Sequence, residues 1–188
     1  MRDKIKDAIF ESIQVKEELL RSEIGTVIKI TKAVIDCLKN SGKVILFGNG
    51  GSASDCQHIA AEFIGRFKKE RRALPAIALT TNSSVITALA NDYEYAVVFS
   101  RQLEALGQKN DLAIGISTSG KAKNVLTAIK QAKKMGIKTV ALTGGDGGEL
   151  AKTADIALIV PSLNTPRIQE AHITIGHIIC EVAEQSLC

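Results

Sequence analysis

Five short segments rich in apolar residues, each followed by a loop of small residues and then by a helical pattern, constrain the fold of this 188-residue chain more than any other feature. The segments are Lys43–Phe47, Ala76–Leu79, Asp111–Ile116, Lys138–Leu142 and Asp155–Val160. Four of them are nearly continuous apolar runs, as strands covered on both faces should be. Strands that alternate with helices in this way predict a three-layer, doubly wound α/β sandwich with a five-stranded parallel sheet.

Apolar residues spaced three to four apart predict the helices that cover this sheet. We expect them at about Ser54–Phe67, Val85–Ala90, Phe99–Leu106, Ala122–Met135, Glu149–Lys152 and Arg167–Leu187. Residues 1–42 show the same spacing and end at Asn40-Ser41-Gly42, which predicts an N-terminal helical hairpin. This hairpin is too apolar to stand alone and should pack on the sandwich of residues 43–188 or on another subunit. Because no linker or repeat appears, we expect residues 1–188 to form a single domain.

The composition excludes several classes of protein. Hydrophobic residues make up 45% of the chain and charged residues 23%, which is ordinary for a soluble globular protein. No apolar run approaches the roughly 18 to 20 residues that cross a bilayer, and residues 1–7 alternate charges where a signal peptide would be apolar. We therefore expect a cytoplasmic protein with no membrane attachment. The four cysteines, Cys37, Cys56, Cys180 and Cys188, lack CxxC spacing and should be reduced thiols.

The charges are scattered, with 24 basic against 20 acidic side chains and a net charge of +4. One dense basic cluster, Lys68–Arg72, slightly favours small anionic ligands. Aromatic residues are only 4% of the chain and tryptophan is absent, so few side chains could stack on nucleic-acid bases. We therefore expect no nucleic-acid partner.

The loops after the strands are the candidate sites, because an open parallel sheet binds its ligand at the carboxyl ends of its strands. The first, Gly48–Ala53, formally matches the dinucleotide pattern GxGxxA. The next strand, however, runs into Leu79–Asn82 without the acidic residue that would bind a ribose, and no lysine follows the glycines as in a Walker loop. What remains is a loop whose N–H groups can approach an anion or a polyol, or a tight turn without a ligand.

The loop after the third strand, Ser117-Thr118-Ser119-Gly120, combines three hydroxyl groups with the free N–H groups of a helix start. Such a loop can hold a phosphate without a cation. Helix capping alone would need one hydroxyl rather than three, which makes it the weaker alternative. The loop after the fourth strand, Gly144–Gly148, has no side chain that indicates a chemical role.

Two helices beside these loops carry all three histidines. His58 and Glu62 share one helical face, where they could ligate a metal, act as proton donor and base, or form a surface ion pair. His172 is most simply a buried core histidine. Gln169 and His177 differ by roughly 80° and about 12 Å of rise on one helix, so sharing an ion would stretch both. Either they reach one substrate from opposite sides or ligands from different subunits meet, and both arrangements favour a site at an interface.

Together these segments closely resemble the phosphoheptose isomerases of the sugar isomerase (SIS) family. The resemblance rests on Gly48-Asn49-Gly50-Gly51-Ser52-Ala53, the His58/Glu62 helix, Ala90-Asn91-Asp92-Tyr93, Ile116-Ser117-Thr118-Ser119-Gly120, and Thr165-Pro166-Arg167-Ile168-Gln169-Glu170-Ala171-His172 with His177. It covers essentially the whole chain. The hydroxyl loop is common to SIS proteins in general, whereas the other motifs taken together are more specific.

The resemblance implies a cytoplasmic homotetramer of the flavodoxin-like SIS fold, with active sites at subunit interfaces. The implied reaction converts sedoheptulose 7-phosphate to D-glycero-D-manno-heptose 7-phosphate through an enediol, the first step toward nucleotide-activated heptose for lipopolysaccharide or other glycans. One Zn²⁺ per subunit is implied, with the ligands His58, Glu62, Gln169 and His177. Catalysis is implied for Glu62 and His177. Substrate contacts are implied for Asn49, Gly50, Gly51, Glu62, Asn91, Asp92, Ser117, Thr118, Ser119 and Gln169.

Two positions depart from the family pattern. Ala122 stands where another serine is common, and Pro166 stands where some members carry an acidic residue. One hydrogen bond to phosphate could be lost at Ala122, with Lys121 or Lys123 in a position to compensate. Neither departure touches the implied acid, base or metal ligands, so both concern affinity more than the type of reaction.

Two other functions compete with this interpretation. The main one is a non-catalytic SIS protein that senses a phosphosugar or associates with the bacterial replication initiator. The other is an isomerase of hexose or pentose phosphates. A non-catalytic protein has no reason to keep Glu62, Gln169 and His177 together, so their joint presence favours an enzyme.

Overall fold

The structure, a computed structural model that describes all 188 residues, contains one five-stranded sheet. Its strands are β1 (Val44–Gly48), β2 (Ala76–Ala78), β3 (Leu112–Ile116), β4 (Lys138–Gly144) and β5 (Ile156–Val160). They lie in the order β2-β1-β3-β4-β5, and every neighbouring pair is parallel. The prediction of a five-stranded parallel sheet is confirmed.

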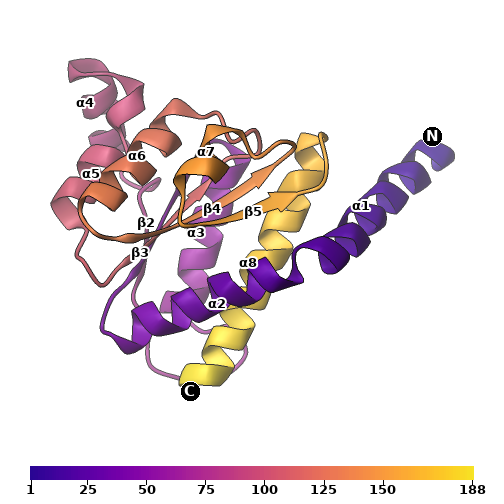
Figure 1. The fold of residues 1–188 in the computed structure, drawn as a ribbon, viewed down its shortest axis with the longest axis horizontal. Helices are drawn as coiled ribbons and strands as arrows, with labels where there is room; N and C mark the ends of the chain where they lie inside the picture. Colours follow the sequence, from indigo (N-terminus) through magenta and orange to yellow (C-terminus); the bar gives the residue numbers. More distant parts are fainter.

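Helices cover both faces of the sheet and complete the three layers that Figure 1 shows. The helical elements are α1 (Arg2–Ser22), α2 (Ile24–Lys39), α3 (Gly51–Ile64), α4 (Ser83–Asp92), the 3₁₀ turn η1 (Tyr95–Val97), α5 (Ser100–Leu106), α6 (Lys123–Lys134), α7 (Gly148–Thr153) and α8 (Thr165–Leu187). Buried residues of α2, α3 and α8 form one core with the sheet, and those of α5, α6 and α7 form the other. None of the helices is both long enough and apolar enough to cross a membrane.

Strand β1 shows how the sequence produces two cores. Its side chains alternate between the two faces of the sheet, as in any β-strand. Val44 and Leu46 belong to the core with α2, α3 and α8, whereas Ile45 and Phe47 belong to the core with α5 and α6. All four side chains are fully buried, which explains why such a strand is a continuous apolar run in the sequence.

The first two helices do not form the expected hairpin. Only Glu23 separates α1 from α2, and helical hydrogen bonds continue on both sides of it, from its N–H to the Leu19 carbonyl and from the Val27 N–H to its own carbonyl. One residue is too short a connection for a reversal, so the chain only bends and α1 projects away from the sandwich (Figure 1). The prediction of a hairpin is therefore wrong, although α2 packs on the sheet as expected.

Helices α3 and α8 lie side by side and run in the same direction on one face of the sheet (Figure 1). Three pairs of residues are in contact, in the same order along both helices: Gly51 with Gln169, His58 with His177, and Phe67 with Glu184. Phe67 lies in the loop just after α3. We call this line of contacts the α3/α8 seam. It brings together candidate side chains that lie more than a hundred residues apart in the sequence.

Candidate active site

Two of the candidate loops meet at strand β1, where the strand order changes direction: the chain goes from β1 to β2 on one side and then to β3 on the other. Strand β1 lies between β2 and β3, and in open parallel sheets this reversal point is where ligands bind. The loop after β1 carries Asn49, Gly50 and Gly51, and the loop after β3 carries Ser117–Gly120. Because β1 and β3 are hydrogen-bonded neighbours, the glycine loop and the hydroxyl loop lie next to each other.

The two glycines of the first loop are required for different reasons. Gly50 has a φ of 54°, a conformation that residues with a side chain rarely adopt. Gly51 begins α3, and a Cβ atom there would lie 2.4 Å from Nε2 of Gln169. The first glycine therefore shapes the turn, and the second makes room for the Gln169 side chain.

Asn49 joins the two loops through a pair of amide hydrogen bonds. Its Nδ2 donates to Oδ1 of Asn124, and its Oδ1 accepts from Nδ2 of Asn124, both at 2.8 Å. The hydroxyl of Tyr95 donates to the same Oδ1 at 3.2 Å. Only one N–H of the Asn49 amide is left for a substrate. Neither Asn124, which is buried in the first turn of α6, nor Tyr95 was predicted as a site residue.

The hydroxyl loop borders a cavity of about 330 Å³ that extends to the N-terminus of α8. Thr118, Ser119 and Lys121 line it. Ser117 does not; it is buried, and its N–H donates to a carbonyl of β4. Ala122 precedes α6 without a side-chain cap, and in the first turn of that helix only the N–H of Val125 meets a side-chain oxygen, Oδ1 of Asn124 at 3.0 Å. A small anion suits such a cavity better than an apolar ligand does.

The two lysines that could compensate for Ala122 differ in their surroundings. Lys121 lines the cavity and lies 3.9 Å from Asp146, with both side chains largely exposed. Lys123 instead pairs with Glu94 at 3.2 Å and does not line the cavity. Only Lys121 is therefore placed to meet a bound anion.

Three side chains converge on the exposed side of the α3/α8 seam. Nε2 of His177 lies 3.1 Å from Nε2 of His58, which in turn lies 3.2 Å from Oε1 of Glu62. One potential ligand atom from each residue lies within 4.8 Å of the others. Two imidazole nitrogens and a carboxylate oxygen form a donor set that Zn²⁺ accepts, with a position left for a further ligand. We call these three residues the metal triad, because their donor atoms fit a metal ion.

Gln169 is not part of the metal triad within one chain. It lies against Gly51 at the start of α3, whereas His58 lies two turns further, about 10 Å along the helix. Helix α8 is continuous from Thr165 to Leu187, so Gln169 and His177 are separated by about 12 Å of rise. The separation inferred from the sequence is therefore present in the structure.

Asn91 and Asp92 lie at the exposed C-terminal end of α4, a helix with no buried residue. Nδ2 of Asn91 donates to Oδ1 of Asp92 at 2.9 Å. Neither side chain forms a hydrogen bond with another predicted site residue. Asp92 is not among the side chains that converge with His58 and His177 within ligand distance.

His172 has the place of a core histidine, as expected. It is fully buried, and its Nε2 lies 3.0 Å from the carbonyl oxygen of Thr143, while its Nδ1 has no partner. Burial lowers its pKa to about 4, against which the hydrogen bond to Thr143 acts only weakly. The ring is thus neutral near pH 7 and contributes to packing.

The basic cluster Lys68–Arg72 offers less to an anion than its composition indicated. The side chain of Arg71 is buried and pairs with Glu184 at 2.9 Å, and Lys68 pairs with Glu181 at 2.6 Å. Burial acts to raise the pKa of Glu184, but its hydrogen bonds to three backbone N–H groups and to Arg71 outweigh burial and lower that pKa to about 2. Sequence reasoning missed this pair; the available signal was a carboxylate one turn after buried Cys180 on the inner face of α8.

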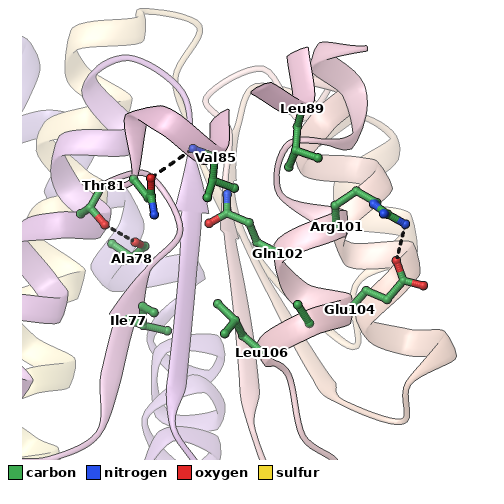
Figure 2. Close-up of a pocket in the computed structure, with 11 residues that line it drawn as sticks. Ile77, Ala78, Thr81, Val85, Leu89, Arg101, Gln102, Glu104 and Leu106 are labelled. Atoms are coloured by element: carbon green, nitrogen blue, oxygen red, sulfur yellow. Dashed lines mark hydrogen bonds and ion pairs between the residues drawn. The ribbon is translucent and has the colours of Figure 1, made fainter. Parts of the chain in front are cut away.

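The largest cavity lies away from these residues, between β2, α4 and α5, and has a volume of about 680 Å³ (Figure 2). No predicted site residue lines it. Figure 2 shows apolar side chains such as Leu89 along it, Arg101 paired with Glu104, and Thr81 bonded to a backbone carbonyl. Since these polar groups are paired with their neighbours, the cavity lacks the free, convergent polar groups of a catalytic site.

Comparison with known proteins agrees with this arrangement. The SIS domain family matches residues 9–144. The phosphoheptose isomerase of Thermodesulfovibrio yellowstonii is 51% identical over 187 residues, which cover 100% of this chain and 93% of that protein. The phosphoheptose isomerase of Sulfurimonas denitrificans is 52% identical over 189 residues, covering 100% of this chain and 97% of that one.

A solved structure gives the same result in three dimensions. The phosphoheptose isomerase from Francisella tularensis superposes with a TM-score of 0.94 at 40% identity, and the match covers 97% of both chains. Similarity at this level extends over the N-terminal helices as well as the sandwich. The chain belongs to the SIS domain family, and within that family to the phosphoheptose isomerases.

Proposed function

We propose that this protein is an aldose–ketose isomerase that converts sedoheptulose 7-phosphate to D-glycero-D-manno-heptose 7-phosphate through an enediol. The convergence of Glu62 with His58 and His177 carries the proposal. A protein that only binds phosphosugars has no need of a carboxylate and two imidazoles at one point, whereas an isomerase needs a base and an acid. Full-length similarity to phosphoheptose isomerases supports the same reaction.

Glu62 is the proposed base for the carbon-bound proton. It removes a proton from C1 of the ketose to form the enediol and delivers a proton to C2 to form the aldose. Its Oε1 atom faces His58, whereas its Oε2 atom forms no hydrogen bond within the chain and is free to carry the proton. The two oxygens of one carboxylate can thus serve different partners.

His177 is the proposed acid for the oxygens. As the enediol forms, Nδ1 of the imidazole gives a proton to the carbonyl oxygen at C2, and it takes one from the hydroxyl at C1 as the aldose forms. Nδ1 forms no hydrogen bond within the chain, so it is free to carry this proton while Nε2 faces His58. The contact between the His177 and Phe67 rings, with centroids 5.6 Å apart, restricts the orientation of the imidazole.

We propose one Zn²⁺ per subunit, with His58, Glu62 and His177 as ligands and Gln169 as the fourth. A bound zinc ion would stabilise the negative charge that develops on the substrate oxygens. Because about 12 Å of helix separates Gln169 from His177, we propose that Gln169 comes from a neighbouring subunit.

A homotetramer with active sites at its interfaces is part of the same proposal. Helix α1 leaves Ile5, Ile9, Phe10 and Ile13 exposed by 47% to 62%, which favours burial against another subunit. The metal triad faces outward from the α3/α8 seam, where a second chain could complete it. The exposed Asn91 and Asp92 would likewise meet substrate across such an interface.

The rest of the substrate is assigned to the two loops. We propose that Thr118 and Ser119 hold the phosphate through hydroxyl and N–H groups, with Lys121 compensating for Ala122. Ser117 would contribute its hydroxyl alone, because its N–H is bonded to the carbonyl of Leu142. Asn49 would offer its one free N–H to a sugar hydroxyl, while Gly50 and Gly51 would let backbone groups approach the sugar. We place the reaction in the cytoplasm, at the first step of nucleotide-activated heptose synthesis for lipopolysaccharide or another glycan.

The test is turnover of sedoheptulose 7-phosphate by metal-defined protein, with and without added Zn²⁺. We expect Glu62→Gln and His177→Ala to lose at least about a hundredfold in kcat, the usual contribution of a general acid or base. Glu181→Gln, which changes a partly exposed carboxylate one turn from His177, is the matched control and should remain active. Full activity in Glu62→Gln contradicts the assignment of the base.

The alternative of a non-catalytic SIS protein predicts a different result in the same experiment. Such a protein would bind the phosphosugar, detected by calorimetry, without turnover under any metal condition. Binding would then depend on the hydroxyl loop and be indifferent to Glu62 and His177. That outcome would make the lost serine at Ala122 the leading clue to function.

A further inference from the structure

A buried ion pair lies at the end of the α3/α8 seam, beyond the metal triad. The guanidinium of Arg71 and the carboxylate of Glu184 are 2.9 Å apart, and their side chains are only 3% and 1% exposed. Removing one member of such a pair leaves the other as an unpaired buried charge. The pair therefore acts as a unit.

The Glu184 carboxylate holds the segment that follows α3. Its Oε1 accepts the N–H of Phe67 at 2.9 Å, and its Oε2 accepts the N–H groups of Lys68 and Lys69 at 2.8 and 2.9 Å. Three consecutive backbone donors thus converge on one side chain of α8. This arrangement fixes Phe67, whose ring contacts His177.

Arg71 holds the end of α3 itself. Its Nη2 atom donates to the carbonyl of Glu62 at 2.8 Å, and its Nη1 atom donates to the carbonyls of Phe63 at 2.9 Å and Gly65 at 3.2 Å. Carbonyls in the last turn of a helix have no partner within the helix, so Arg71 caps α3. One of these carbonyls belongs to Glu62, a member of the metal triad.

Each member of the pair therefore connects to the metal triad: Arg71 through the carbonyl of Glu62, and Glu184 through Phe67, which contacts His177. His177 and Glu184 are two turns apart on α8 and face the same side. We propose that Arg71 and Glu184 are positioning residues, which hold Glu62 and His177 at the separation that allows them to share a metal ion. This inference rests on the proposed function, because it concerns the same site.

The alternative is that the pair only stabilises the fold. The chain offers a matched control in Asp111, whose side chain is also 1% exposed and accepts hydrogen bonds from a lysine ammonium and two backbone N–H groups. None of its partners lies on α3 or α8. Asp111→Asn should cost stability as Glu184→Gln does, without reaching the metal triad.

The first readout needs no metal and no activity. The chain has only three histidines, so a spectrum of metal-free protein labelled at histidine Cε1 contains three signals. We expect Glu184→Gln to shift the signals of His58 and His177 and to leave that of His172 in place. Asp111→Asn should leave all three in place.

The second readout is Co²⁺ affinity, measured from the absorption of the bound ion. We expect Glu184→Gln to bind Co²⁺ at least tenfold more weakly than the wild type, as when partners of metal ligands are removed, while Asp111→Asn binds it normally. Arg71→Lys keeps the positive charge opposite Glu184, but a lysine cannot bond to all the α3 carbonyls that Arg71 reaches. We therefore expect it to shift the signals of His58 and His177 as well. If Glu184→Gln does not fold, this variant decides whether the pair positions the metal triad.

The possible results separate cleanly. If the Glu184→Gln and Arg71→Lys proteins are less stable but keep wild-type histidine signals, the pair is only structural and the inference is wrong. Equal shifts in Asp111→Asn would also overturn it, because they would indicate general loosening. If the wild type binds neither Co²⁺ nor Zn²⁺, the proposed metal centre fails, and the histidine spectra still decide the positioning role.

Discussion

The side chain of Lys121 allows the anion site to be tested at a single residue. It is the one lysine that lines the cavity beside Thr118 and Ser119. A charge-assisted hydrogen bond to phosphate is worth about 1.5 to 3 kcal/mol, so Lys121→Ala should raise KM for the phosphosugar about tenfold or more with little change in kcat. Lys123→Ala removes a cation that pairs with Glu94 and should leave KM unchanged. If both changes raised KM equally in steady-state kinetics, the lysines would act only through the overall positive charge near the site and not through a direct contact with the phosphate.

Gly51 allows a second test at the scale of one atom. A Cβ there would lie 2.4 Å from Nε2 of Gln169, so Gly51→Ala must displace that side chain. We expect activity to fall at least about tenfold, since small misplacements at a reacting site are costly. Gly25→Ala is the matched control, because no atom lies within 4 Å of the added methyl group and alanine favours helix. The prediction fails if both variants have wild-type turnover.

At the scale of the element, α1 has apolar residues that its own chain does not cover. Only Val15 and Leu19 of this helix are buried, whereas Phe10 is 62% exposed. Phe10→Asp should therefore shift the protein to smaller oligomers, measured by sedimentation velocity, and reduce activity if the sites lie at interfaces. Lys6→Glu, a charge change on an exposed position of the same helix, should leave the sedimentation coefficient unchanged. A monomeric wild type would contradict the proposed tetramer.

Elements defined by local patterns could be predicted from the sequence, and relations between elements could not. Continuous apolar runs identified β1, β3 and β4 within one or two residues, because burial on both faces leaves a local signature. The α1–α2 relation was wrong because apolar spacing predicts helices without saying how a one-residue connection orients them.

The same limit applies to the candidate site. His58 and Glu62 form a visible pattern on one helix, but their distance to His177 depends on how α3 packs on α8. Asn124 resembles any residue in the first turn of a helix until its amide is seen against Asn49. Side chains that act through long-range pairing leave no local signature in a single sequence.

At the scale of the whole molecule, His172 makes stability depend on pH. Burial lowers its pKa from 6.5 to about 4, so between these values the unfolded chain binds a proton that the folded chain does not. The contribution of His172 to the free energy of unfolding is thus fully present above pH 6.5. It is lost as the pH drops toward 4, which lowers the free energy of unfolding by about 3 kcal/mol in total. His172→Gln should flatten this dependence, measured as urea midpoints at pH 7.5, 5.5 and 4.5. An equally steep profile in the variant would assign the pH dependence to other groups.

The parallel pairing of α3 and α8 also has a consequence for how the chain can change in length. Contacts at Gly51–Gln169 and at Phe67–Glu184 occupy opposite ends of the same seam. One residue inserted into α8 between them would turn the downstream half by about 100° and advance it by about 1.5 Å, so only one end could stay in register. Natural insertions and deletions should therefore be tolerated in the loops between strands and helices but excluded from this stretch of α8, whose length is set by the two contacts at its ends.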